Sequence, residues 1–273
     1  MAVDRKIKIM GIINLTDDSF YAASRMAGKG GMPDLDAVRV RVTSMLEEGA
    51  DIIDFGACST RPGSDPVDSE TEWKRLEPVL RLVRGEFPDL DFSIDTFRSE
   101  IVRRAYDIAG PFVVNDITAG QADYEMLPTV GGYGLTYVAM HSAGPSGAAG
   151  DYPDGVVKSV MDYFEEFARE AAACGIEDWI LDPGFGFSKT VAENWELLDN
   201  LSCLKAFGKE ILVGVSRKRM IYEPLGLTPE TCLEATQKAH RVAIANGAGI
   251  LRVHDVGAAV STAAQACKEE SQE

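Results

Sequence analysis

Short apolar stretches alternate with helical patterns along almost the whole of this chain. The stretches expected to form strands are residues 6–13, 51–55, 91–94, 112–114, 135–139, 179–181, 211–213 and 249–251. Helical spacing predicts helices over residues 34–48, 69–86, 98–108, 124–130, 156–174, 191–204 and 229–246, and a last helix from about residue 258. Ser69-Glu-Thr-Glu72 fits a capping box at the start of the second helix. Alternation of this kind implies parallel strands.

The number of repeats separates two parallel folds. Eight units in about 250 residues predict an α/β fold of the (β/α)8 TIM barrel type. This length is near the upper limit for one hydrophobic core, so the chain could form one large α/β domain or two small ones. No linker is evident between its halves, so we expect a single domain over residues 1–273, with its core from about residue 6 to about residue 267. The alternative, an open doubly wound sheet, usually carries G-x-G-x-x-G after its first strand, and here that strand ends in Asn14-Leu-Thr-Asp-Asp18.

Charge and cysteine content narrow the class of protein. The chain has 27 Lys and Arg against 43 Asp and Glu, a net charge of −16, which argues against binding nucleic acid or an anionic membrane but still allows a basic site for an anionic substrate. No membrane span or signal peptide is expected, because no run of about 18 uncharged apolar residues occurs. The five cysteines form no C-x-x-C pair, so we expect a cytoplasmic protein without a disulfide framework or structural zinc.

The stretch Asp182-Pro-Gly-Phe-Gly-Phe187 directly follows a strand expected to be buried on both faces. Pro183 offers no N–H and Gly184 and Gly186 release the backbone, so the strand stops with a carboxylate at its C-terminal end. The glycines let a ligand approach the main chain, and a phenylalanine ring could lie against a planar ligand. Taken alone, such a motif is better explained as a surface Asp in a glycine-rich turn than as a ligand site. The polar residues at the other strand ends make a ligand site the better explanation.

Polar residues follow most of the other predicted strands. In a parallel barrel the C-terminal strand ends meet at one face, where active sites are built. The residues at those ends are Asn14, Thr60, Arg61, Asp95, Asn115, His141, Asp182, Lys218, Arg252 and His254.

This set divides into two chemistries. The short acidic and amide side chains suit a flat heterocycle with several N–H groups; they are Asp95, Asn115 and Asp182. The cationic side chains suit a phosphate or pyrophosphate; they are Arg61, Lys218, Arg252 and His254. Asn14, with the neighbouring Thr16, Asp17 and Asp18, could help to place Mg²⁺, which accepts a few oxygen ligands and keeps its waters.

Each of these residues also has a purely structural explanation. Asp95 and Asp182 could cap the helices that follow them, and Arg252 and His254 could pair with a local carboxylate such as Asp255. Lys218 could be a solvated charge. For any single residue the structural explanation is the better one. Their coincidence at the strand ends favours a common site, provided that the strands are assigned correctly.

Taken together, the motifs resemble the dihydropteroate synthases, in order and in spacing, from about Lys8 to Val260. The motifs that carry the resemblance are Met10-Gly-Ile-Ile-Asn14-Leu-Thr-Asp-Asp-Ser-Phe20, Ser59-Thr-Arg-Pro-Gly63, Ser93-Ile-Asp-Thr96, Val114-Asn-Asp-Ile117, Met140-His141, Asp182-Pro-Gly-Phe-Gly-Phe187, Ser216-Arg-Lys218 and Arg252-Val-His-Asp-Val256. The resemblance implies a cytoplasmic, homodimeric (β/α)8 barrel of folate synthesis. Such an enzyme condenses 6-hydroxymethyl-7,8-dihydropterin diphosphate with 4-aminobenzoate, uses Mg²⁺ and is a sulfonamide target.

The same resemblance implies a role for each matching position. The pterin would be held by Asp95, Asn115, Asp182 and Lys218, with Met140 and Phe187 packed near it and Gly214 also in the substrate site. The diphosphate would be held by Asn14, Arg252 and His254, with Asn14 also touching Mg²⁺. The loop over aminobenzoate would contain Thr60, Arg61 and Pro62, and the catalytic residues would be Asp95, Lys218 and Arg61. Diphosphate would leave a pterin methylene cation, which the arylamine attacks, so no protein nucleophile is required.

Two positions depart from the family pattern. Asp17 stands where the family has Pro, which would loosen the first loop and add a negative charge. Arg219 stands where the family has a Ser that helps to receive the aminobenzoate carboxylate, so Arg219 could take that carboxylate by charge or could crowd the site. We therefore expect altered sulfonamide sensitivity.

Three other functions compete with this interpretation. A methyltransferase that moves a methyl group from a reduced folate to a corrinoid would need the pterin pocket but not the diphosphate cations. A catalytically silent pterin-binding barrel is allowed by Asp17 and Arg219. A phosphate-binding sugar isomerase would not need both buried aspartates and Asn115.

Overall fold

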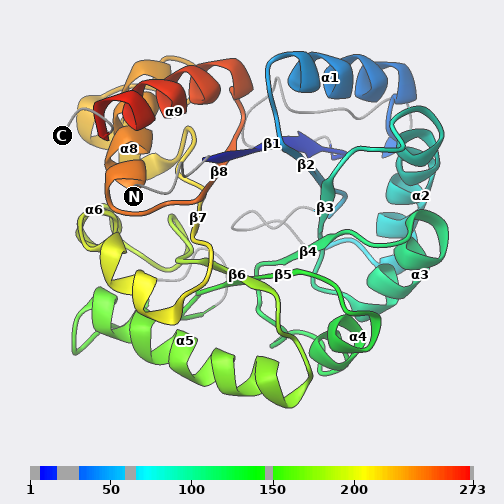
Figure 1. Cartoon of the computed structure of the whole chain (residues 1–273), viewed down its shortest axis with the longest axis horizontal. Coiled ribbons are helices and arrows are strands. Elements are labelled where there is room, and N and C mark those ends of the chain that lie inside the picture. Colours follow the sequence, from blue (N-terminus) through cyan, green and yellow to red (C-terminus); the bar gives the residue numbers. More distant parts are fainter. Residues whose placement is uncertain (1–6, 17–30, 59–65, 145–149, 271–273) are drawn as a thin grey trace.

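The computed structural model describes residues 7–16, 31–58, 66–144 and 150–270. Within these ranges the chain forms one sheet of parallel strands, drawn at the centre of Figure 1. The strands are β1 (Lys8–Asn14), β2 (Ile52–Gly56), β3 (Phe92–Asp95), β4 (Val113–Asp116), β5 (Tyr137–Met140), β6 (Trp179–Asp182), β7 (Leu212–Val213) and β8 (Ile250–Val253). Every predicted strand is confirmed to within about two residues at each end, because apolar runs bounded by Gly, Pro, Asn and Asp mark short buried strands well.

The strand order shows a closed barrel. The sheet runs β6-β5-β4-β3-β2-β1-β8-β7, and a parallel bridge between Leu181 and Ile211 joins its two edges. The main-chain N–H of Leu181 also donates to the carbonyl of Glu210 at 2.9 Å across this seam. The predicted (β/α)8 barrel is therefore confirmed.

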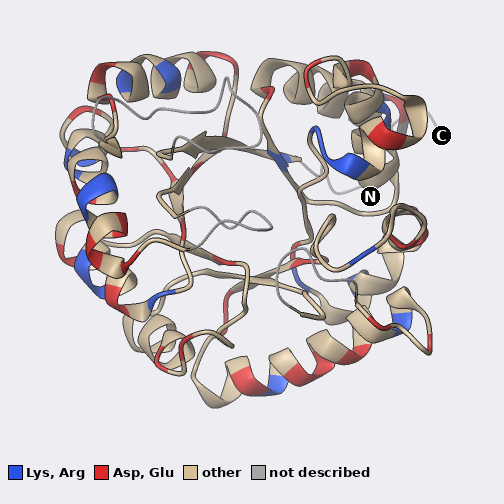
Figure 2. Cartoon of the chain, turned by 180° about the vertical axis from the view of Figure 1, so that it is seen from behind, with Lys and Arg blue, Asp and Glu red and all other residues tan. Residues whose placement is uncertain are grey.

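Helices form a ring around the strands, as Figure 1 shows. They are α1 (Leu35–Glu47), α2 (Ser69–Glu86), α3 (Ser99–Ala109), α4 (Met126–Tyr133), α5 (Val156–Ala173), α6 (Val191–Asp199), α7 (Arg219–Tyr222), α8 (Leu233–Ala245) and α9 (Val256–Glu270), with 3-10 turns η3 (Leu201–Phe207) and η4 (Glu223–Leu225). In the part of the chain that the structure describes, no helix combines the length and apolar character that crossing a membrane requires. Figure 2 shows Asp and Glu spread around this outer ring, in keeping with the acidic composition.

Three helix assignments made from the sequence need correction, and one helix was missed. The helix predicted over 191–204 is divided at Asn200, and the one predicted from 229 begins only at Leu233. The short helix α7 was not predicted. The helix expected over 124–130 runs through Gly131 and Gly132 to Tyr133, and ends at Gly134 in the left-handed region (φ 63°). Gly131 lies in the helix because a Cβ atom there would be 1.9 Å from the carbonyl oxygen of Cys174.

The capping box predicted at Ser69-x-x-Glu72 is wrong. The cap of α2 is Asp68, whose carboxylate accepts from the main-chain N–H of Thr71 at 2.7 Å. Glu72 is instead buried and forms an ion pair with Arg98, which lies between β3 and α3. Because its carboxylate is taken up by this buried pair, Glu72 does not complete a capping box.

The core has two parts. A small cluster drawn from the strands alone fills the barrel interior; it contains Met10, Ile52, Val138, Ile180, Leu212 and Ile250. A larger cluster packs the helices onto the outside of the strands. The two clusters together fix the strands, and therefore the side chains at their ends, in a rigid frame.

Candidate active site at the C-terminal rim of the barrel

Strand register places the predicted polar residues at one level. Asn14 pairs with Gly56, Gly56 with Asp95, and Asp95 with Asn115 across four neighbouring strands. A Cβ atom at Gly56 would lie 3.5 Å from Asn14 Oδ1 and 3.7 Å from Asp95 Cβ, so the side chains of Asn14 and Asp95 both lie next to this position. Thr60, Arg61 and Pro62 lie outside the described residues, as does Asp17.

Arg252 on β8 connects Asp95 of this row with Asp54, which lies two residues before Gly56 on β2. Its Nη2 lies 3.0 Å from Asp95 Oδ2, and its Nε and Nη2 lie 2.8 and 2.5 Å from Asp54 Oδ2. Asp54 also accepts from the Ser93 hydroxyl at 2.5 Å and from the Asn115 amide at 3.2 Å. The structural explanation in which Arg252 pairs with Asp255 is therefore wrong.

Asp54 is a residue that the sequence analysis missed. It is completely buried within a strand of otherwise apolar residues and faces the barrel interior, where it fixes Arg252 and Asn115. A carboxylate in such a strand requires a partner, because burying an unpaired charge is strongly unfavourable. The sequence Ile-Ile-Asp-Phe therefore indicates that Asp54 needs a buried partner, but it does not identify that partner.

Burial raises the pKa of the Asp95 carboxyl to about 7, partly offset by the charge of Arg252 and increased by Asp54. Asp95 therefore lies close to its titration midpoint at neutral pH. When it is ionised, a carboxylate at this position can stabilise a positive charge that develops near it, such as a cation in a reacting ligand.

Asp182 and Lys218 form the opposite side of the rim. Asp182 accepts from the main-chain N–H of Gly184 at 2.8 Å, and burial raises its pKa against the nearby charge of Lys218. Burial lowers the pKa of Lys218 to about 8, offset by the charge of Asp182. Lys218 Nζ donates to the carbonyl of Phe185 at 2.5 Å and lies 4.9 Å from the centre of the Phe187 ring.

Close approach of backbone and side chains explains the glycines here. A Cβ atom at Gly184, where φ is 70°, would lie 1.9 Å from the carbonyl oxygen of His141. A Cβ atom at Gly214 would lie 3.9 Å from both Lys218 Nζ and Arg252 Cβ, which places Gly214 between the two cations. Met140 pairs in register with Asp182 and is buried beside Gly184. These contacts bring together Asp182, Gly214, Lys218 and Arg252, as predicted.

Lys189 is a second residue whose role the sequence did not reveal. Its buried Nζ donates to the carbonyls of Gly184 and Phe187 at 3.0 and 3.2 Å and lies 3.0 Å from His141 Nδ1. Burial lowers the pKa of Lys189 to about 7, partly offset by the charge of Asp182, and burial with the charge of Lys189 lowers the pKa of His141 to about 3. The predicted strand-end residue His141 thus faces this lysine, and Lys189 ties down the loop after β6.

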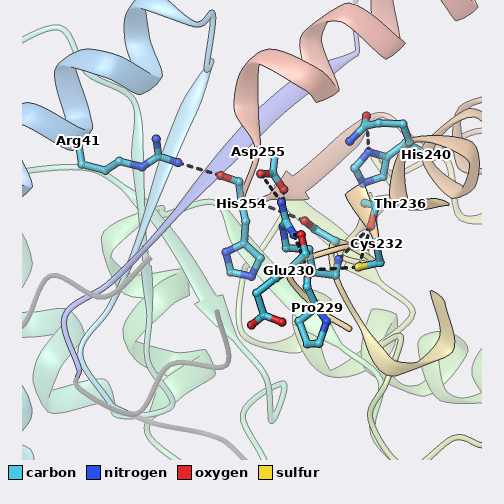
Figure 3. Close-up of polar contacts among 11 residues, drawn as sticks. Arg41, Pro229, Glu230, Cys232, Thr236, His240, His254 and Asp255 are labelled. Atoms are coloured by element: carbon cyan, nitrogen blue, oxygen red, sulfur yellow. Dashed lines mark hydrogen bonds and ion pairs between the residues drawn. The ribbon is translucent and has the colours of Figure 1, made fainter. Parts of the chain in front are cut away.

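His254 follows β8 in a tightly connected turn, shown in Figure 3. Its main-chain N–H donates to the Ser216 hydroxyl at 3.2 Å, and its carbonyl accepts from Arg41 of α1 at 2.8 Å. Burial, with the charge of Arg252, lowers the pKa of the His254 ring to about 3. His254 is therefore a neutral imidazole at physiological pH, suited to hydrogen bonding more than to charge pairing.

Arg219, the unusual residue after Lys218, begins α7 and points to solvent. Its Nε lies 2.9 Å from Glu223 Oε2, and two thirds of its side chain (66%) is exposed. An exposed pair of this kind contributes little to stability.

The donor set limits what metal this rim could hold. Among the residues that the structure describes, no group of three or more His, Cys, Asp and Glu could bind a metal ion. Asn14 offers an amide oxygen beside Asp95. A site with one protein oxygen fits Mg²⁺, which keeps most of its waters and completes its shell with ligand phosphates.

The chain matches a known protein family and is similar to several characterised proteins. The model of the pterin binding enzyme family matches residues 10–254. A dihydropteroate synthase of Haemophilus influenzae is 37% identical over 255 residues, which covers 92% of this chain and 90% of that protein. The folate synthesis bifunctional protein of Arabidopsis thaliana is 37% identical over 270 residues, and the folic acid synthesis protein of Pneumocystis carinii is 38% identical over 258. The chain spans 47% and 34% of the length of these last two relatives.

Solved structures share the whole architecture. A dihydropteroate synthase of Clostridium difficile, crystallised in the presence of pteroic acid, superposes with a TM-score of 0.88 at 34% identity and covers 98% of both chains. A dihydropteroate synthase of Xanthomonas albilineans with 4-aminobenzoic acid gives a TM-score of 0.86 at 35% identity, over 98% of this chain and 94% of that one.

Proposed function

Because the chain belongs to the dihydropteroate synthase family of pterin binding enzymes, we propose that it condenses 6-hydroxymethyl-7,8-dihydropterin diphosphate with 4-aminobenzoate. The products are 7,8-dihydropteroate and diphosphate, so the enzyme is a transferase of folate synthesis. A chain with similar relatives in bacteria and an acidic, cysteine-poor composition suits a cytoplasmic enzyme, and we propose a homodimer by analogy with the family.

The observation that carries this proposal is the gathering of acidic, amide and cationic side chains at one rim of the barrel, where Arg252 lies 3.0 Å from Asp95. Asp182 and Asn115 present an acceptor and an amide, which match the N–H and carbonyl groups of an amino-pyrimidinone ring. Lys218 adds a donor for the ring carbonyl, and Met140 and Phe187 supply apolar contact with the flat pterin. Arg252 and the neutral imidazole of His254 face the position of the diphosphate on the other side.

The reaction requires charge stabilisation and no protein nucleophile. Departure of diphosphate leaves a methylene cation conjugated with the pterin, and the carboxylate of Asp95 is placed by Arg252 to stabilise it. Mg²⁺, held by Asn14 and the phosphate oxygens, would neutralise the leaving group. Arg252 and His254 bind and orient that group.

The aminobenzoate side of the site is assigned by position alone. Thr60, Arg61 and Pro62 come after β2 in the sequence, and β2 ends at Gly56, which pairs with Asn14 and Asp95. We propose that Arg61 contributes to catalysis by closing over aminobenzoate, and that Arg219 receives the aminobenzoate carboxylate in place of Ser. Exclusion of water would protect the cation from conversion to the alcohol.

A coupled assay of dihydropteroate formation, with and without Mg²⁺, tests the proposal. We expect turnover by the native chain, and a loss of about 10²-fold or more in kcat for Asp95→Asn and Lys218→Ala, the size seen when one stabilising group is removed. Lys238→Ala, which removes an exposed lysine of α8, is the matched control and should leave turnover unchanged. Pterin binding without product would instead support a silent barrel, and methyl transfer from a reduced folate to a corrinoid would support the methyltransferase.

A further inference from the structure

Arg217 occupies a position between the two halves of the site. It precedes Lys218, on the pterin side, and its buried guanidinium binds the carboxylate of Asp255, which follows His254 on the diphosphate side. The contact is bidentate, with Nε 2.7 Å from Asp255 Oδ2 and Nη2 2.8 Å from Asp255 Oδ1. A planar fork of this kind fixes both distance and orientation.

Other contacts keep Arg217 in place. Its φ of 53° is in the left-handed region, which a residue with a side chain rarely adopts unless its surroundings require it. Its Nη1 donates to the carbonyls of Pro229 and Glu230, which are labelled in Figure 3. Its main-chain N–H donates to the Thr236 hydroxyl of α8 at 3.3 Å.

The turn after β8 is held from its other side as well. Ser216, the residue before Arg217, accepts from the His254 N–H, and Arg41 donates to the His254 carbonyl at 2.8 Å. Figure 3 shows Arg41 reaching this carbonyl from α1, opposite Asp255. Residues 216–218 and 252–255 are therefore joined by the bidentate Arg217–Asp255 pair and by the hydrogen bond from His254 to Ser216.

We propose that Arg217 and Asp255 are positioning residues that fix the separation between the pterin-binding and diphosphate-binding halves of the site. The inference rests on the proposed function, because it assigns Lys218 to the ring and His254 to the diphosphate. Neither Arg217 nor Asp255 touches substrate in this assignment. Their effect is on a ligand that must occupy both halves at once, since a small displacement between two subsites penalises the linked ligand far more than either fragment.

The test compares three ligands by calorimetry: 6-hydroxymethyl-7,8-dihydropterin, inorganic diphosphate with Mg²⁺, and the joined pterin diphosphate with Mg²⁺. For Asp255→Asn, we expect the Kd of each fragment to change less than about twofold and the Kd of the joined ligand to rise about tenfold or more. Arg217→Lys, which keeps the charge and loses the fork, should show a smaller change in the same pattern. If Asp255→Asn does not fold, the three dissociation constants of Arg217→Lys alone test the positioning role.

Two controls keep the outcomes separate. Glu234→Gln breaks the exposed pair with Lys238 on the neighbouring helix and should leave all three constants unchanged. Equal weakening of all three ligands, or no weakening of the joined one, would overturn the positioning role. Failure of the native chain to bind pterin diphosphate would instead overturn the proposed function.

Discussion

The guanidinium of Arg252 rests on the carboxylate of Asp54, a residue 198 positions earlier in the chain, with Nε and Nη2 2.8 and 2.5 Å from Oδ2. Asp54 is completely buried below the rim, whereas the Arg252 side chain is 20% exposed. The buried carboxylate thus holds the cation from beneath, and the upper edge of the guanidinium remains available to Asp95 and to an anion.

Asp54→Asn should unfold more easily than the native protein by about 3 kcal/mol, because a buried guanidinium then loses its principal counter-charge. Turnover should fall as well, since Arg252 and Asn115 both lose the group that orients them. Urea unfolding and the dihydropteroate assay measure the two effects. Asp107→Asn, on the exposed face of α3, is the control. Native stability in the Asp54 variant would contradict the role given to this pair.

The dependence of kcat/KM on pH should be bell-shaped. Asp95 acts as a carboxylate, so activity should fall as the pH drops below its pKa of about 7. Lys218 acts as an ammonium, so activity should fall as the pH rises above its pKa of about 8. Lys218→Arg should move the alkaline limb upward, because a guanidinium keeps its proton. An alkaline limb that stays in place in this variant would assign it to another group.

Lys189→Met should loosen the loop after β6. The substitution keeps most of the side-chain volume but leaves the carbonyls of Gly184 and Phe187 without their buried donor, at a cost of about 2 kcal/mol in the free energy of unfolding. KM for pterin diphosphate should rise, since this loop carries Phe187. Lys158→Met removes an exposed lysine of α5 and should change neither quantity. Identical behaviour of the two variants would exclude the anchoring role of Lys189.

Two adjacent glycines of α4 should respond oppositely to alanine. Gly131→Ala should destabilise the protein by about 3 kcal/mol or more, because its methyl group would overlap the carbonyl oxygen of Cys174. Gly132→Ala has no atom within 4 Å of its new methyl group and should stabilise α4 by about 0.5–1 kcal/mol, as alanine favours the helix. Thermal unfolding of the two variants side by side is sufficient; equal shifts would rule out the close contact.

Arg219→Ser should change the competition between 4-aminobenzoate and a sulfonamide. The aminobenzoate carboxylate carries a full charge, whereas a sulfonamide carries less, so loss of the cation should favour the inhibitor by about two- to fivefold, the size expected for an exposed charge pair. KM for aminobenzoate and inhibition by a sulfonamide measure this ratio. Arg241→Ser, an exposed arginine of α8, is the control. An unchanged ratio in the Arg219 variant would show that its guanidinium does not reach the ligand.

The strands and most of the rim were predictable because their signals are local. Apolar runs followed by Asn14, Asp95, Asn115 and Asp182 mark strand ends, and the closed barrel makes those ends converge. Pairing between distant residues gives no such signal. The sequence suggested Asp255 as a partner for Arg252. In the structure Asp255 pairs with Arg217, and Arg252 pairs with Asp54 and Asp95.

Helix boundaries failed where tertiary contact overrides local preference. Gly131 and Gly132 look like a helix stop, yet the helix passes through them because Gly131 meets the backbone near Cys174. Lys189 was assigned no role from the sequence, yet it is buried with its Nζ within 3.2 Å of two carbonyl oxygens and of His141 Nδ1. Neither neighbour is visible within a short stretch of sequence.

The seam of the barrel between β6 and β7 has a bearing on dynamics. β7 contains only Leu212 and Val213. It is connected to β6 through the isolated bridge between Leu181 of β6 and Ile211, the residue before β7. Amide protons here should exchange with solvent sooner than those of β1 and β2, since sparse pairing opens at lower free energy. Asp182 is the last residue of β6 and Lys218 follows β7, so the two residues lie on opposite sides of this seam. A pterin bound to both would hold the two strands together and slow that exchange.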